Sequence, residues 1–234
     1  MAITDMNNSV CCLHIKLSGD PCQAPARACG TARREGAVVR CCAMDVDWSV
    51  ELEAEDPTLA VPWVSEDGSQ RYYDLRARPE MLLYVDEAAQ HRELGEFLTA
   101  INSANSCLQS AKCDVWASRE LTEAEGIYGA ACKRCSYVDL FFAETAPRMD
   151  FPQHEEFAKK LTTLLKRAPQ ISAAAEFIVR RAHYEGKSGF YFTFELAGYG
   201  DDEEDAKKRW MIALNLIANA ILQLSASRVT SAEC

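Results

Sequence analysis

Cysteines that could do chemistry occur along this 234-residue chain without a diagnostic motif. Cys132 and Cys135 form a C-x-x-C pair, which could be a redox dithiol or half of a zinc site. A redox pair normally lies at a helix N-terminus, but this pair leads into a predicted strand. A zinc site needs two more ligands, and Cys107, Cys113 and His183 stand at no diagnostic spacing. The sequence therefore favours a structural or incidental pair over a metal or redox site.

Three carboxylates fall on predicted strands that could be neighbours, namely Asp114, Asp139 and Glu195. Carboxylates that share one sheet face could do acid–base work. Such groups are more often solvated partners of arginines, and Arg134 and Arg180 are available here. We therefore predict no catalytic residue from this set.

The remaining polar motifs have simpler structural explanations. His183 is expected at a strand rim, and His91 and His154 are expected to be exposed at helix starts. The five acids at residues 201–205 lack the alternation and glycine of an EF-hand loop, and they suit a helix N-terminus. No phosphate loop, nucleophile elbow, H-E-x-x-H or dinucleotide fingerprint occurs, so no cofactor is predicted.

The most regular part of the chain is residues 174–224, which predict two strands followed by a long helix. Alternation gives these strands an apolar core face, made of Phe177, Val179, Phe190, Phe192, Phe194 and Leu196. If residues 185–188 form a four-residue loop without a bulge, Phe177 stands opposite Leu196. The sequence thus predicts both the faces and the register of this hairpin.

The opposite face of these strands is the predicted functional surface. Together with the strand over residues 134–143, it carries a set of candidate ligand-binding residues, namely Tyr137, Asp139, Arg180, Tyr191, Thr193, Glu195 and Tyr199. An open sheet face rich in tyrosine is a reasonable ligand site. Arg180 and Glu195 are diagonal neighbours there and are expected to be able to pair.

A weaker copy of the same strand–strand–helix pattern precedes this stretch, over residues 112–168. Two such ββα units predict a mainly antiparallel sheet with helices on one face, which is a two-layer α+β sandwich. An N-terminal hairpin around Asp67–Gly68 and helices after Pro79 complete the prediction. We expect one α+β domain over residues 44–234, with a hairpin and helical part at 44–110, a duplicated core at 111–225 and a flexible tail at 226–234.

Residues 1–43 differ in composition from the rest, because they hold more than half of the eleven cysteines and no aromatic residue. A metal-binding arm, a disordered tail and a natural start at Met44 are the alternatives. The cysteine spacing gives no C-x2-C knuckle, so a disordered or non-native Cys-rich extension is favoured over a metal arm. The odd cysteine count and the lack of a signal-peptide pattern predict a reducing cytoplasm.

The formal charge of −10 disfavours nucleic acid as a partner, and the longest apolar run is too short to predict a membrane span. The preferred hypothesis is a non-enzymatic binding or assembly module, since the C-terminal helix has more apolar surface than one sheet needs. This helix predicts a homo-oligomer or a protein partner. The alternative is an enzyme or small-ligand-binding protein with a pocket on the open sheet face.

Overall fold

The computed structural model describes residues 44–232. The predictions for residues 1–43 lie outside the described residues. The elements in chain order are β1 (Asp45–Glu51), β2 (Thr58–Val61), η1 (Pro79–Tyr84), α1 (Asp86–Gln90), α2 (Arg92–Ile101), β3 (Leu108–Ser118), η2 (Ala124–Tyr128), β4 (Cys132–Phe142), α3 (Thr145–Arg148), α4 (Phe151–Leu165), β5 (Ala173–Tyr184), β6 (Lys187–Gly200) and α5 (Glu203–Ala232).

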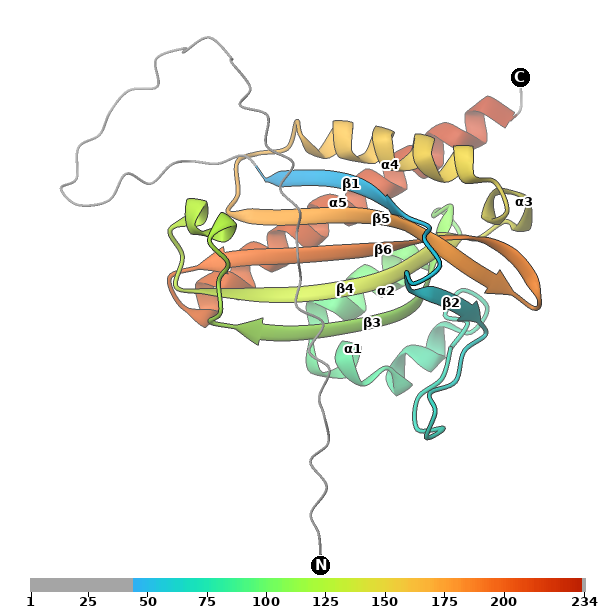
Figure 1. Cartoon of the computed structure of the whole chain (residues 1–234), viewed down its shortest axis with the longest axis horizontal. Coiled ribbons are helices and arrows are strands. Elements are labelled where there is room, and N and C mark those ends of the chain that lie inside the picture. Colours follow the sequence, from blue (N-terminus) through green and yellow to red (C-terminus); the bar gives the residue numbers. More distant parts are fainter. Residues whose placement is uncertain (1–43, 233–234) are drawn as a thin grey trace, which may run out of the picture. The chain divides into compact units, whose positions relative to one another are not determined.

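The strands form one open six-stranded sheet, so the predicted α+β class is confirmed (Figure 1). The strand order is β1-β5-β6-β4-β3, and the short β2 also pairs with β5. β1 and β2 run parallel to successive parts of β5, whereas the β5–β6, β6–β4 and β4–β3 pairs are antiparallel. β3 therefore forms one edge of the sheet.

The β5–β6 hairpin has the predicted faces but a different register. Its loop has two residues, Glu185 and Gly186, and both have positive φ values of 49° and 84°. This geometry suits a tight hairpin turn, which removes two residues from the predicted loop. Phe177 consequently pairs with Phe194 instead of Leu196. A shift of two residues preserves the alternation, so the predicted core face is retained.

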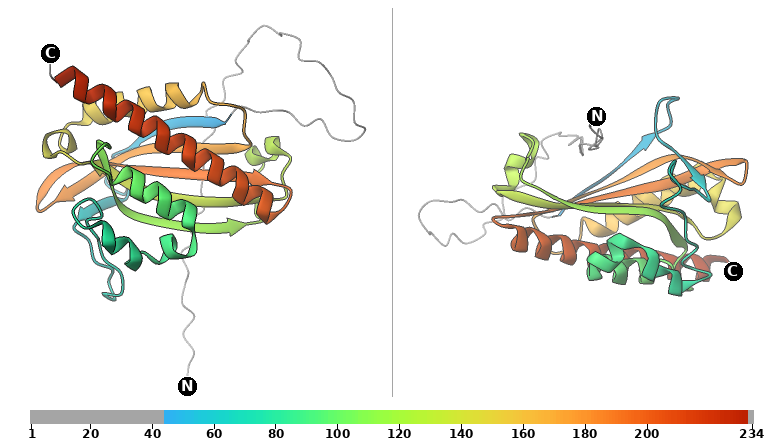
Figure 2. Two further views of the ribbon diagram at one scale, coloured as in Figure 1. Left: turned by 180° about the vertical axis from the view of Figure 1, so that it is seen from behind. Right: turned by 90° about the horizontal axis from the view of Figure 1, so that it is seen from below.

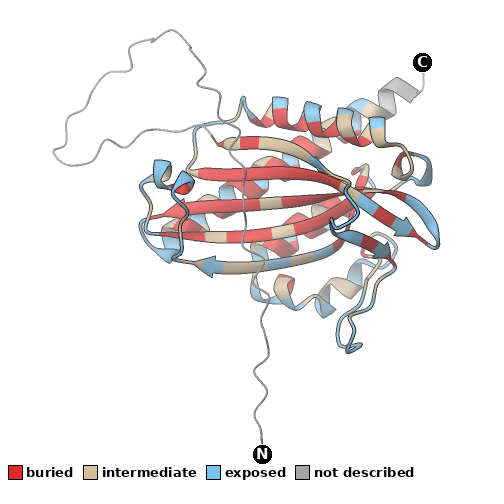
Figure 3. Cartoon of the chain, in the orientation of Figure 1, coloured by how far each residue is buried: buried red, intermediate tan, exposed pale blue. Residues whose placement is uncertain are grey.

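The helices α2, α4 and α5 all lie on the same face of the sheet, as the two views of Figure 2 show. They bury an aromatic and aliphatic core against β4, β5 and β6. Fully buried members include Phe97 of α2, Trp210 of α5 and Phe177 of β5. Figure 3 shows that these three strands are largely buried, whereas residues 112–118 of β3 are exposed or intermediate.

Side-chain caps fix where the two long helices begin. Asp150 precedes α4, and its carboxylate accepts a hydrogen bond from the Gln153 backbone N–H at 3.3 Å. Asp202 precedes α5 and accepts from the Asp205 backbone N–H at 2.8 Å. The acidic run at 201–205 thus caps a helix, as the sequence predicts. The helix continues to Ala232, so most of the predicted tail at 226–234 is helical.

Three local predictions are wrong. The hairpin around Asp67–Gly68 is reduced to a turn and a single bridge, because β2 pairs with β5 instead. β3 begins at Leu108, before the start at residue 112 that the strand–strand–helix pattern predicts. His154 is fully buried and not exposed. It lies in contact with Phe142 and Phe192, and this burial lowers its pKa to about 4.

Candidate functional site

All seven predicted ligand-binding residues lie on the same face of three adjacent strands, opposite the helices, although Tyr199 stands at one end of it. In the sheet register, Tyr137 of β4 pairs with Glu195 of β6, and Asp139 of β4 pairs with Thr193 of β6. Arg180 of β5 pairs with Tyr191 of β6. The alternation of the strands is what gathers these side chains from distant parts of the sequence.

A continuous polar chain crosses this face. Arg180 donates from Nη1 to Thr193 Oγ1 at 2.8 Å, and Thr193 Oγ1 donates to Asp139 Oδ1 at 2.8 Å. On its other side Arg180 forms an ion pair with Glu51 of β1, with an Nη2–Oε2 distance of 2.7 Å. The predicted pairing of Arg180 with Glu195 is therefore replaced by pairing with Glu51, which the sequence analysis did not consider.

Two carboxyl groups of this face, those of Asp139 and Glu195, have raised pKa values. Burial raises the pKa of Asp139 to about 6, although the hydrogen bond from Thr193 opposes this shift. Burial also raises the pKa of Glu195 to about 7, and the nearby Glu176 adds to the shift while Arg180 opposes it. Groups with such pKa values can exchange protons near neutral pH. The two carboxyl groups could therefore take part in proton transfer. Burial is the largest cause of both pKa shifts.

The predicted site residue Tyr199 lies apart, at the far end of β6. Its hydroxyl donates to Glu125 Oε1 at 2.9 Å, and its ring stacks on Tyr128 with centroids 4.0 Å apart. Glu125 also forms a buried ion pair with Lys133, with an Nζ–Oε1 distance of 2.8 Å. This cluster holds η2 against the sheet, so Tyr199 has a structural role in this arrangement.

The other end of the same face is covered by β2 and the segment that follows it. A second apolar cluster forms there, made of Leu59, Val61, Ala111, Phe141, Ala182, Tyr184 and Tyr191. The guanidinium of Arg148 lies over the Phe141 ring at 4.7 Å. The candidate Tyr191 is part of this cluster and is buried, so it contributes packing surface.

The pair Cys132 and Cys135 lies in β4, with both cysteines buried and unpaired. Residues three apart in a strand point to opposite faces, so the two thiols do not converge. Burial raises the pKa of Cys135 to about 12, which disfavours the reactive thiolate. Within residues 44–232, no group of three or more His, Cys, Asp or Glu side chains is arranged to hold a metal ion.

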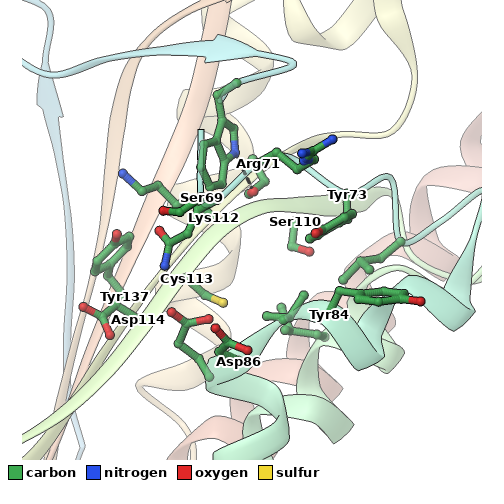
Figure 4. Close-up of a pocket in the computed structure, with 17 residues that line it drawn as sticks. Ser69, Arg71, Tyr73, Tyr84, Asp86, Ser110, Lys112, Cys113, Asp114 and Tyr137 are labelled. Carbon is green, nitrogen blue, oxygen red and sulfur yellow. Dashed lines mark hydrogen bonds between the residues drawn. The ribbon is translucent and has the colours of Figure 1, made fainter. Parts of the chain in front are cut away.

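A cleft lies beside the exposed edge of the sheet, and we call it the β3 cleft. Its walls come from the segment between β2 and η1 (residues 63, 69–71, 73 and 75), from residues 84–87 and Leu98, and from residues 110–114 and Tyr137. Its volume is about 170 Å³. Figure 4 shows Cys113, Asp114 and Asp86 on one side of it and Tyr73 and Tyr84 on the other.

Trp63 fixes one wall of this cleft to the sheet edge. Its indole Nε1 donates to the Ala111 carbonyl oxygen at 2.9 Å, and the Lys112 ammonium lies 5.5 Å from its ring centroid. An edge strand has outward backbone groups without sheet partners, and Trp63 satisfies one of them. Tyr73 and Tyr84 approach each other with ring centroids 6.1 Å apart. The cleft is thus built from rings as well as charged groups.

This cleft was not predicted from the sequence, although three of its residues, Cys113, Asp114 and Tyr137, were considered as candidates. Tyr137 and Asp114 belong both to the sheet face opposite the helices and to the cleft lining. The other walls come from segments that were predicted only as a hairpin and a helix. The density of aromatic residues between 63 and 84 could have indicated a cleft wall, because polar connecting segments seldom carry so many rings.

Comparison of this chain with known protein families, with curated proteins and with solved structures finds no significant match. One helix, α5, is long and apolar enough between Glu203 and Arg228 to cross a membrane, judged only by length and composition. Core helices of proteins without membrane spans pass the same test, and α5 packs Trp210 and Leu214 into the core. Its composition is therefore weak evidence for a membrane.

Proposed function

We propose that this protein is a binding module whose ligand is a small organic molecule held in the β3 cleft. The observation that carries the proposal is the cleft itself, where rings and charged side chains meet beside an unpaired strand edge. Ligand pockets typically combine apolar and aromatic walls with a few polar groups that fix orientation.

The size of the cleft limits what it can hold. Its volume of about 170 Å³ exceeds the ~10–15 Å³ that a single water requires. It is smaller than the ~300–1,000 Å³ of pockets for drug-sized ligands. We infer that the ligand is small, or that only one end of a longer ligand enters the cleft.

The pocket that we predicted on the open sheet face remains a related proposal. Lys112, Asp114 and Tyr137 join the cleft to the strip that carries Asp139 and Glu195. A ligand that extends from the cleft along this strip could reach carboxyl groups with raised pKa values. Catalysis by those groups is an extension of the binding proposal, and the binding experiment below comes first.

Self-association through α5 has less support. The motivation for it was an apolar surface broader than one sheet face could cover. The sheet, α2 and α4 together cover that surface, and Ile212 is its exposed large hydrophobic residue among those described. Most of the apolar surface of α5 is thus covered within the chain, which weakens the original argument for an oligomer through this helix.

We also propose that the architecture is a two-layer sandwich built from two ββα units. The two units would be β3-β4-α4 and β5-β6-α5, whose second strands, β4 and β6, are neighbours at the centre of the sheet. In this proposal β1, β2 and the segments up to α2 are additions that shape the β3 cleft. The binding site would then lie between the duplicated core and its N-terminal addition.

The binding proposal is tested by a fragment screen, using ligand-observed NMR on the full chain. The key variant is Tyr84→Ala, and the matched control is Leu83→Ala. Both residues are exposed, at 63% and 83%, but only Tyr84 lines the cleft. We expect fragments that bind the wild type and the control but lose binding to Tyr84→Ala. Binders that are insensitive to both substitutions, or no binders at all, would contradict the proposal.

A further inference from the structure

Three carboxylates meet at one side of the β3 cleft. Asp86 and Glu87 begin α1, and Asp114 projects from the exposed edge strand β3. Glu87 is half-buried, whereas Asp86 and Asp114 stand at the exposed rim. Figure 4 shows Asp86 and Asp114 on the same side as Cys113, with Arg71 beside Tyr73. The two ends of the cleft therefore differ in charge.

No cation of the described chain neutralises this side. Within residues 44–232, none of the three carboxylates forms an ion pair with a lysine or arginine side chain. Lys112 lines the cleft too, but its ammonium lies over the Trp63 ring. The negative charge at the Cys113 side is thus not matched by an ion pair from the described residues.

Three separate groups respond to this excess of negative charge. Burial raises the pKa of Glu87, and Asp114 and Asp86 raise it further. Burial raises the pKa of the Cys113 thiol, and Glu87 and Asp114 again add to the shift. Burial also raises the pKa of Tyr137, with Asp139 and Asp114 as the next contributors. No positively charged side chain is among the main causes of these three shifts.

The opposite wall of the cleft also favours a cation. The faces of Tyr and Trp rings carry negative electrostatic potential and attract ammonium groups. Tyr73 and Tyr84 supply such rings, while Leu75 and Leu98 supply apolar surface for a hydrocarbon chain. Arg71 stands beside Tyr73, on the side away from the carboxylates. Since the described residues hold no metal-binding group of His, Cys, Asp or Glu, an organic cation fits better than a metal ion.

We infer that the ligand of the β3 cleft carries an alkylammonium group, which lies among Asp86, Glu87 and Asp114 while its hydrocarbon part packs on the aromatic wall. This inference rests on the proposed function and names the ligand class for the same site. It assigns Glu87 the central role, because it is the least exposed of the three carboxylates.

The test compares three probes of similar size, namely n-butylammonium, n-butanol and butyrate, at constant ionic strength. Binding is followed by NMR chemical-shift changes on the wild type, Glu87→Gln and the control Glu80→Gln. Glu80 is an exposed acid on η1 that does not line the cleft. We expect n-butylammonium to bind more tightly than the other probes. Glu87→Gln should weaken it about ten-fold, the lower end of the range for a lost hydrogen bond to a charged group, and Glu80→Gln should leave it unchanged.

The outcomes separate the two proposals. If n-butylammonium binds no better than n-butanol, or if Glu87→Gln does not weaken it, the ammonium inference is wrong. Should fragments still bind in a Tyr84-dependent way in that case, the binding function survives with another ligand class. If neither the three probes nor any fragment binds at the cleft, both proposals fail.

Discussion

A methyl group added at Gly198, near the end of β6, would test how closely α5 packs on the sheet. Gly198 pairs with Ala173 and faces the first turns of α5. A Cβ atom at Gly198 would meet the Trp210 backbone nitrogen and would lie 2.7 Å from the Ala206 carbonyl oxygen. Both obstacles are backbone atoms, so no side-chain rotation can relieve the clash. Gly198→Ala must move the helix or the strand.

The expected cost of Gly198→Ala follows from this geometry. Overpacking a close-packed core costs about 1–3 kcal/mol, and a backbone obstacle favours the upper end of this range. For a chain of this size about 3 kcal/mol corresponds to a decrease in Tm of roughly 6–12 °C. The matched control is Gly126→Ala, where an added Cβ meets nothing within 4 Å. That substitution should change stability by less than about 0.5 kcal/mol.

Thermal and urea unfolding, followed by circular dichroism, measure both variants. The reasoning predicts a large loss for Gly198→Ala and almost none for Gly126→Ala. Equal Tm values for the two variants would refute the close approach of α5 to β6. The position of α5 on the sheet would then have to be revised.

Two further predictions concern buried charges. Lys133→Met should destabilise the fold by about 3–5 kcal/mol, because it leaves Glu125 buried without its partner. The double variant Lys133→Met/Glu125→Leu should recover much of this loss in urea unfolding. No recovery would contradict the pairing of Lys133 with Glu125. Glu195 has a pKa raised to about 7 in the folded state, so the folded state binds more protons and stability falls as pH rises from about 4.5 to 7. Glu195→Gln should therefore be more stable than the wild type at pH 8 by about 1–3 kcal/mol and equal to it near pH 4.5, whereas a constant difference across this range would count against the shift.

The alternation of apolar residues was enough to predict the faces of β5 and β6. Phe192 and Phe194 lie in the core, and Thr193 and Glu195 lie on the opposite face. The register could not be predicted, because it depends on the backbone conformation of Glu185. Its positive φ is uncommon outside glycine and leaves no clear mark in the sequence.

Burial of polar residues was harder to predict than strand alternation. His154 stands in the first turn of α4, where exposed polar residues are usual, but the sheet brings Phe142 and Phe192 around it. The sequence indicates no partner for Glu51. The parallel pairing of β1 with β5 places it beside Arg180. Both facts depend on contacts between segments more than ten residues apart, which local patterns do not encode.

The β3 cleft was missed for a related reason. Its walls come from segments as far apart in sequence as Trp63 and Tyr137. The sequence supplied the residue types, but the pairing of β2 with β5 determines the path of the chain past Ala111. Only the part of the cleft lining that lies on regular strands, such as Asp114 and Tyr137, could be assigned to strands from the sequence.

The most direct test of the binding function is a crystal structure of the full chain soaked with the tightest fragment from the screen. We predict that the fragment lies in the β3 cleft, between the Tyr84 ring and the side that carries Cys113 and Glu87. A fragment bound elsewhere, with the cleft unoccupied, would contradict the assignment of this cleft as the functional site.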